Sequence, residues 1–179
     1  PTLSGIASGT LANGQTVILQ SDGTVTGIAT VGTAQTVGVA TVFNAATSEN
    51  MAVVYDSTND KVVIAYRDKG DSAQPGTAVV GTVTGTDITF GTPVVFESGQ
   101  AEYITATYDS TNSKVIIAYQ DNDDSNKGKA VVGTVSGTSI SFGSAGEFEP
   151  GEATYISATY DSTNEKVVVV YRDGENSNY

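Results

Sequence analysis

Short apolar stretches, separated by Gly, Asn, Asp, Ser and Thr, recur along most of the chain. In its central part this pattern predicts strands at residues 103–108, 114–119, 129–135 and 139–142, joined by polar turns and loops. After its first residue, the second of these strands is apolar at successive positions, which indicates burial on both faces, as where sheets pack on sheets. No window has a convincing helical period. The sequence therefore predicts an all-β protein.

The predicted strands return along the chain at a nearly constant interval. The motif Tyr-Asp-Ser-Thr-Asn occupies residues 55–59, 108–112 and 160–164, at steps of 53 and 52 residues. Residues 101–121 and 153–173 are identical at 14 of 21 positions. Such self-similarity is typical of repeat proteins, and four strands per repeat are typical of propellers. We predict a β-propeller-like array of four-stranded repeats of about 52 residues; a linear β-solenoid or a row of small sandwiches is the alternative.

The repeat divides the chain into two predicted parts. Residues 1–40 do not follow it; there, two short apolar runs flank a Ser-Asp-Gly turn signal at 21–23, which predicts a β-hairpin anchor or cap. The remainder, 41–179, comprises repeats at 41–91 and 92–143 and an incomplete repeat at 144–179. This count does not close a propeller. We expect a fragment of a longer array; closure with copies of itself, or with strands from the N-terminal part, are the alternatives.

Composition and charge narrow the chemistry that is open to this chain. It has no His, Cys or Trp, so the usual general base at neutral pH, the thiol nucleophile and the common zinc ligands are absent. A net charge of −12 repels phosphate backbones and argues against nucleic-acid binding. The longest apolar runs, such as residues 62–66, are five residues long and predict no membrane span.

The Tyr-Asp-Ser-Thr-Asn motif is the most regular candidate site. Repeated around a ring, it would suit glycan or cation binding. The same residue types, however, satisfy the backbone of a tight hairpin turn. We interpret the motif as structural.

The loop at residues 121–128 is the candidate metal site. Its oxygen-bearing side chains at alternating positions resemble half of a calcium loop, with Asp121, Asp123 and Ser125 as the predicted ligands. Lys127 opposes a cation, and a Glu at the calcium-loop spacing is missing, so a solvated acidic loop is the alternative. No other cofactor is predicted, no catalytic residue is assigned, and the residues that would bind another ligand are unknown.

Two stretches carry a resemblance to a known class of proteins. Residues 5–17, continuing into 21–25, resemble a segment common in structural proteins of marine tailed phages. The repeat, Tyr-Ile-Thr/Ser-Ala-Thr-Tyr-Asp-Ser-Thr-Asn-x-Lys-Val followed by Tyr-Arg/Gln-Asp, is similar to arrays in tail-fibre-like virion proteins of such phages. The resemblance implies a virion or extracellular location and no catalytic residue.

These observations together predict a non-enzymatic structural virion protein of the tail-fibre or tail-associated kind. Its predicted partners are other virion proteins, copies of itself in a homo-oligomer, and cell-surface glycans held by many weak contacts. The alternative is a bacterial or archaeal extracellular adhesin or filament protein. A glycan-processing propeller enzyme is a third hypothesis, although no cluster of carboxylates breaks the symmetry of the repeats.

Overall fold

The computed structural model describes residues 6–7, 17–19, 24–27 and 37–175 of a chain that divides into two compact units, 1–37 and 38–179. In the first unit, β1 (Ile6–Ala7) pairs in parallel with β3 (Thr24–Gly27), and β3 pairs antiparallel with β2 (Val17–Leu19). The β2–β3 ladder joins the two apolar runs that flank residues 21–23. The turn at 21–23 lies outside the described residues.

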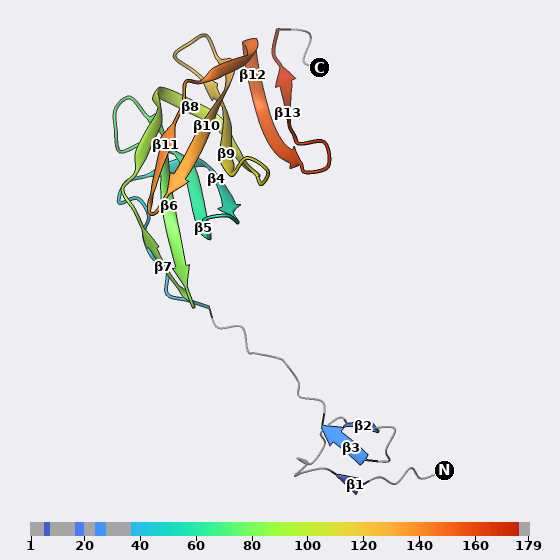
Figure 1. Ribbon diagram of the computed structural model, residues 1–179. Helices are drawn as coiled ribbons and strands as arrows, with labels where there is room; N and C mark the ends of the chain where they lie inside the picture. The colour runs from blue at the N-terminus through green and yellow to red at the C-terminus, as the bar shows by residue number, and fades with distance from the viewer. Residues whose placement is uncertain (1–5, 8–16, 20–23, 28–36, 176–179) are drawn as a thin grey trace. The chain divides into compact units, whose positions relative to one another are not determined.

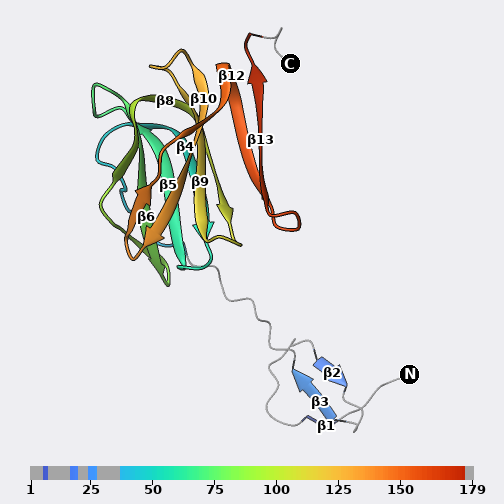
Figure 2. The ribbon, with the colours of Figure 1, turned by 45° about the horizontal axis from the view of Figure 1, so that its top comes forward.

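The second unit is built from antiparallel strands, and its described residues contain no helix. The strands are β4 (Ser48–Asp56), β5 (Lys61–Asp68), β6 (Pro75–Thr84), β7 (Asp87–Phe90), β8 (Val94–Asp109), β9 (Lys114–Asp121), β10 (Lys127–Ser136), β11 (Ser139–Phe142), β12 (Gly146–Asp161) and β13 (Lys166–Asp173). They pair in the order β13-β12-β10-β9-β8-β6-β5-β4, with β7 beside β6 and β11 beside β10. Within this unit the sheet curls strongly between its edges (Figures 1 and 2). The all-β prediction is confirmed.

The long strands β8 and β12 carry the sheet from one repeat into the next. The first part of β8 pairs with β6 and the second part with β9; in the same way β12 pairs first with β10 and then with β13. The ladder of β8 with β9 shifts register between Glu102 and Thr105, around Tyr103, whose φ is 47°. Asn50 in β4 and Tyr155 in β12 have a positive φ at the matching positions. Such bulges bend a strand and increase its twist.

Separate propeller blades of four strands are not what the structure shows. The sequence predicts a first strand that begins at residue 103, whereas β8 begins at Val94 and its early part belongs to the ladder of the preceding repeat. Because β8 and β12 both continue across the boundary between repeats, the strands join into one curled sheet. The established architecture is therefore a curled antiparallel sheet of repeated strands.

The hydrophobic core lies where one repeat packs on the next. Between the first two repeats, Val63 and Ala65 of β5 pack together with Val115, Ile117 and Tyr119 of β9. A second, smaller core lies between the second and third repeats. The central strand β9 is buried at all positions after its first. This confirms, for β9, the prediction that the second strand of the repeat is buried on both faces.

Candidate functional site

The Tyr-Asp-Ser-Thr-Asn turn has the same internal hydrogen bonds in all three repeats. One carboxylate oxygen of Asp109 accepts the backbone N–H groups of Thr111 at 3.0 Å and Asn112 at 2.9 Å, and the other accepts Nδ2 of Asn112 at 2.8 Å. Asp56 and Asp161 accept the three equivalent bonds in their own turns. We call these three residues the turn aspartates. Their carboxylates are engaged within the turn, which supports the structural interpretation of the motif.

Hydrogen bonding lowers the pKa of each turn aspartate. The main cause is the side chain of Asn112 for Asp109 and that of Asn164 for Asp161. For Asp56, burial on its own raises the pKa, but the hydrogen bonds within the turn outweigh this effect and the pKa is lowered. Each carboxylate is therefore held in its charged form by the folded turn.

The structure places the three predicted calcium ligands in different environments. The carboxylate of Asp121 is buried; one oxygen accepts the backbone N–H of Asp123 at 3.1 Å, and the other accepts the Lys129 ammonium at 2.7 Å. Asp123 is exposed and accepts the backbone N–H of Gln100 at 3.4 Å. Ser125 is exposed, with a φ of 59°. At Asp121, Lys129 thus supplies the positive charge that a bound cation would supply.

Ion pairs organise the rest of this loop. Lys129 also pairs with Asp124 at 2.7 Å, and Lys127 pairs with Asp124 at 3.3 Å and with Glu147 at 3.2 Å. Partial burial on its own lowers the pKa of Lys129, but the hydrogen bonds to Asp121 and Asp124 outweigh it and raise the pKa. In the part of the chain that the structure describes, no group of three or more His, Cys, Asp or Glu residues is placed to hold a metal ion. Calcium binding stays a prediction.

Arg67 connects the first repeat to the second. Its side chain is 8% exposed and pairs with Glu49 of its own repeat and with Glu102 of the next, the latter at 2.5 Å. Gln120 holds the same position in the second repeat, and its Nε2 donates to the backbone carbonyl of Ala153 in the third at 2.8 Å. In both cases the side chain at this position reaches the following repeat.

A tyrosine hydroxyl meets a glutamate in two repeats, and this pair bears on the enzyme hypothesis. Tyr119 donates to Glu97 at 3.0 Å, and Tyr171 donates to Glu149 at 2.8 Å. Burial and then the charge of Glu97 raise the pKa of Tyr119, and the hydrogen bond that Tyr171 donates to Glu149 is the main cause that raises the pKa of Tyr171. A tyrosine nucleophile is activated by the opposite shift. The contact therefore favours a packing role.

One recurring contact was not predicted from the sequence, the packing of a Phe ring on a Tyr ring in each repeat. The pairs are Phe43–Tyr66, Phe96–Tyr119 and Phe148–Tyr171, with ring centroids 5.1, 5.2 and 5.2 Å apart. The two rings are separated by 23 residues in every repeat, and this constant spacing is the signal that was present in the sequence.

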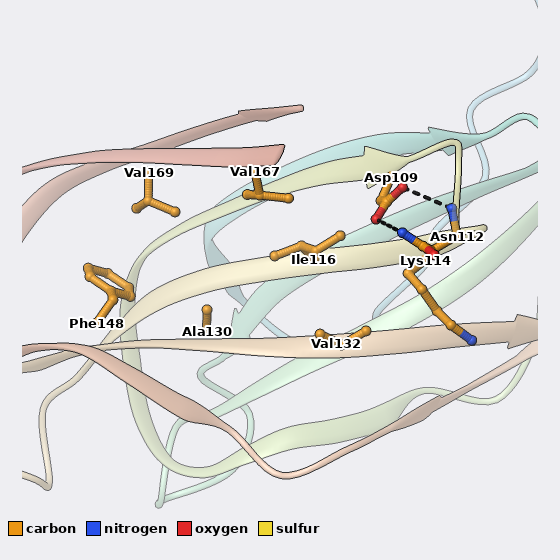
Figure 3. A pocket seen from close by; sticks show the side chains of 9 residues that line it. All are labelled: Asp109, Asn112, Lys114, Ile116, Ala130, Val132, Phe148, Val167 and Val169. Carbon is orange, nitrogen blue, oxygen red and sulfur yellow. Dashed lines mark hydrogen bonds between the residues drawn. The ribbon is translucent and has the colours of Figure 1, made fainter. Parts of the chain in front are cut away.

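A cavity of about 500 Å³ lies between the second and third repeats (Figure 3). Its lining comes from β9 and β10, from the facing strands β12 and β13, and from the turn between β8 and β9. It comprises Asp109, Asn112, Lys114, Ile116, Ala130, Val132, Phe148, Val167 and Val169. Asp109 and Asn112 bond to each other in the turn, and Lys114 donates to Thr134 at 2.8 Å. The polar groups at one end of the cavity thus have partners in the protein, and the rest of the lining is apolar.

The matching space between the first and second repeats is filled with side chains. Val131 and Val135 of β10 and Ile140 of β11 are buried there in the core against the first repeat. The described strands of the third repeat are β12 and β13. The cavity is therefore the region of the repeat interface that a third and a fourth strand fill elsewhere.

Comparison with protein-family models, with curated proteins and with solved structures finds no match. The resemblance to tail-fibre-like phage proteins accordingly stays a prediction from the sequence. Across the described residues, no helix has the length and apolar character needed to cross a membrane.

Proposed function

We propose that the protein is a non-enzymatic structural protein whose repeats form a rigid β scaffold. One observation carries this proposal. The turn aspartates are the most regular polar residues of the repeat, and in all three repeats their carboxylates accept hydrogen bonds from their own turn. A catalytic or ligand-binding carboxylate would instead be presented to a substrate with lone pairs free to accept.

The contacts between repeats support the scaffold as well. Buried apolar side chains, the Arg67–Glu102 ion pair and the hydrogen bond of Gln120 all join one repeat to the next. Repeats that bury their surfaces on their neighbours form elongated, cooperative arrays. A propeller-like continuation of these repeats belongs to the same proposal; its support is that β4, β5, β6 and the early part of β8 lie side by side.

The setting that we propose for this scaffold is a virion, as a tail-fibre or tail-associated component outside the cell. Its support is the sequence resemblance described above. Other virion proteins, copies of the chain and host-surface glycans are the proposed partners.

Mass spectrometry of fractionated material tests the proposed setting. We expect peptides from residues 38–175 to be found in purified virus particles. The same peptides should be depleted from the host cytosol and from the cell envelope. Enrichment in the envelope fraction would favour a surface adhesin instead. Release of reducing sugars from host polysaccharide by the purified protein would contradict the non-enzymatic role.

A further inference from the structure

Equivalent strands have different environments in the second and third repeats. In β9, the side chains of Ile116 and Ala118 lie on the face toward the third repeat and are 7% and 0% exposed. Val168 and Val170 hold the same positions in β13, where they are 47% and 59% exposed. We call Val168 and Val170 the forward face of the third repeat. It is the surface on which, one repeat earlier, another repeat packs.

The first repeat presents the complementary surface. Three residues of β8 pack in the core against the first repeat: Ile104, Ala106 and Tyr108. Their counterparts in β4 are Met51, Val53 and Tyr55, which are 57%, 64% and 54% exposed. We call these three residues the backward face of the first repeat. Apolar surface of this kind, gathered on one side of a strand, marks an interaction site.

A polar contact also recurs across the interface between repeats. The hydroxyl of Tyr108 donates to Thr58 of the preceding repeat at 2.6 Å, and that of Tyr160 makes the equivalent bond to the second repeat, also at 2.6 Å. Tyr55 holds the tyrosine position in the first repeat, where its hydroxyl donates to Asp60 at 2.8 Å, and Thr163 holds the threonine position in the third. The first and third repeats thus carry both residue types of this contact, and Tyr55 would have to exchange Asp60 for a threonine to form it.

We propose that the backward face of one copy packs on the forward face of a second copy, head to tail, so that the contact between copies repeats the contact between internal repeats. The occupant is a second copy because both halves of the interface are present on one chain and the same positions already bind each other internally. Charge agrees: Arg172 and Glu49 hold the positions of Arg67 and Glu102, which form an ion pair across the internal interface.

The geometry of this contact determines the kind of assembly. The two surfaces are different, so the contact is heterologous and produces open chains or closed rings of more than two copies. The inference rests on the scaffold function proposed above. It does not depend on the virion setting, so self-association and particle location fail or succeed separately.

Sedimentation equilibrium on the full 179-residue chain tests the proposal. The wild type is expected to reach at least twice the monomer mass of 18.3 kDa as its concentration rises. Val168→Asp/Val170→Asp blocks the forward face, and Met51→Asp/Val53→Asp blocks the backward face. Each double variant alone is expected to stay at the monomer mass. An equimolar mixture of the two should double in mass and stop there, because one intact forward face meets one intact backward face.

A matched control separates loss of the face from loss of an apolar residue. Val132 is 47% exposed, as Val168 is, but it lines the cavity between the second and third repeats. Val132→Asp is expected to associate like the wild type. If an Asp variant shows no thermal unfolding transition, the matching Thr variant is used instead: Val168→Thr/Val170→Thr or Met51→Thr/Val53→Thr. Thr makes the face more polar but is still favoured in strands.

Three results would overturn the proposal. The first is a wild type that stays monomeric at every concentration. The second is a dimer that survives in either double variant, which would indicate a symmetric contact. The third is a mixture of the two variants that remains monomeric.

Discussion

Gly91 lies directly against the backbone of the following repeat, and alanine at this position tests the packing between the two repeats. A Cβ added to Gly91, between β7 and β8, would lie 1.8 Å from the backbone carbonyl oxygen of Thr138 in the turn between β10 and β11. At Gly143, one repeat later, the nearest atom to an added Cβ is the carbonyl oxygen of Val132, 4.0 Å away. Gly91→Ala and Gly143→Ala therefore make the same change at equivalent positions, but only at Gly91 does the turn of the following repeat lie against the added methyl group.

The expected magnitude follows from the atom that is in the way. Real Cβ atoms essentially never come within 3.0 Å of such an atom, so Gly91 and the turn must move apart by more than about 1 Å. The obstacle is backbone, which no side-chain rotation removes, and overpacking of this kind costs about 1–3 kcal/mol. At Gly143 the methyl group meets no obstacle, and the loss of freedom in the unfolded chain stabilises the fold by about 0.4–1 kcal/mol.

Thermal and urea unfolding, followed by circular dichroism, measure this difference. At about 2–4 °C per kcal/mol for a protein of this size, Gly91→Ala is expected to melt at least about 3 °C below Gly143→Ala. The urea m-value should be the same for both. Gly38→Ala should behave like Gly91→Ala, because its Cβ would lie 1.8 Å from the carbonyl oxygen of Thr86. Equal melting temperatures for Gly91→Ala and Gly143→Ala would refute the described contact between repeats.

Acid is expected to destabilise the fold through the turn aspartates, because folding lowers the pKa of each. Their contribution to the free energy of unfolding is complete above about pH 4, and it is lost as the pH falls through their pKa values in the folded state. Urea titrations across a pH series measure this, and a free energy of unfolding that stays constant down to about pH 2 would contradict it. Glu102→Gln removes one of the two carboxylates that face the buried Arg67 and should lower the free energy of unfolding by about 1–3 kcal/mol; a change below about 0.5 kcal/mol would mean that Glu49 alone suffices. Gly128→Ala places a methyl group 2.4 Å from the Phe148 ring and should cost about 1–3 kcal/mol, part of which the added change Phe148→Leu should restore.

The strands of the repeat could be predicted wherever the sequence pattern is local. Successive apolar residues at 115–119 require burial on both faces, and β9 has it. The fourth predicted strand, 139–142, has the same bounds as β11. The early part of β8 could not be found in this way. Residues 97–100 are Glu, Ser, Gly and Gln, which lack the alternation of a strand, and they lie in β8 because the β6 ladder runs beside them.

The candidate calcium site illustrates a limit of the same kind. The spacing of oxygen atoms along one loop predicts Asp121, Asp123 and Ser125 as ligands. That spacing contains no information about Lys129, which reaches Asp121 from β10. The ladder between β9 and β10 sets Lys127 opposite Asp121 and so brings Lys129 within reach. A motif that is defined by spacing along the chain cannot indicate a partner residue that strand pairing places beside it.

The residue at the position of Arg67 differs between repeats, and it matches the residue that faces it from the following repeat. Arg67 meets the carboxylate of Glu102 in the next repeat. At the following interface Thr154 holds the position of that glutamate, and the facing residue is the neutral Gln120, which donates to a backbone carbonyl. A charged side chain thus occurs where the next repeat offers a carboxylate, because a buried guanidinium without one would be costly.

The same reasoning applies to the outer side of the third repeat. Its residue at this position is again an arginine, Arg172, which lies over the ring of Tyr155 with its guanidinium carbon 5.8 Å from the centroid. By the pattern of the two internal interfaces, a surface that covers Arg172 should carry a carboxylate at the matching position. The first repeat of this chain carries Glu49 there. The residue that varies between repeats therefore favours the same partner that we propose for the apolar faces, a second copy of the chain.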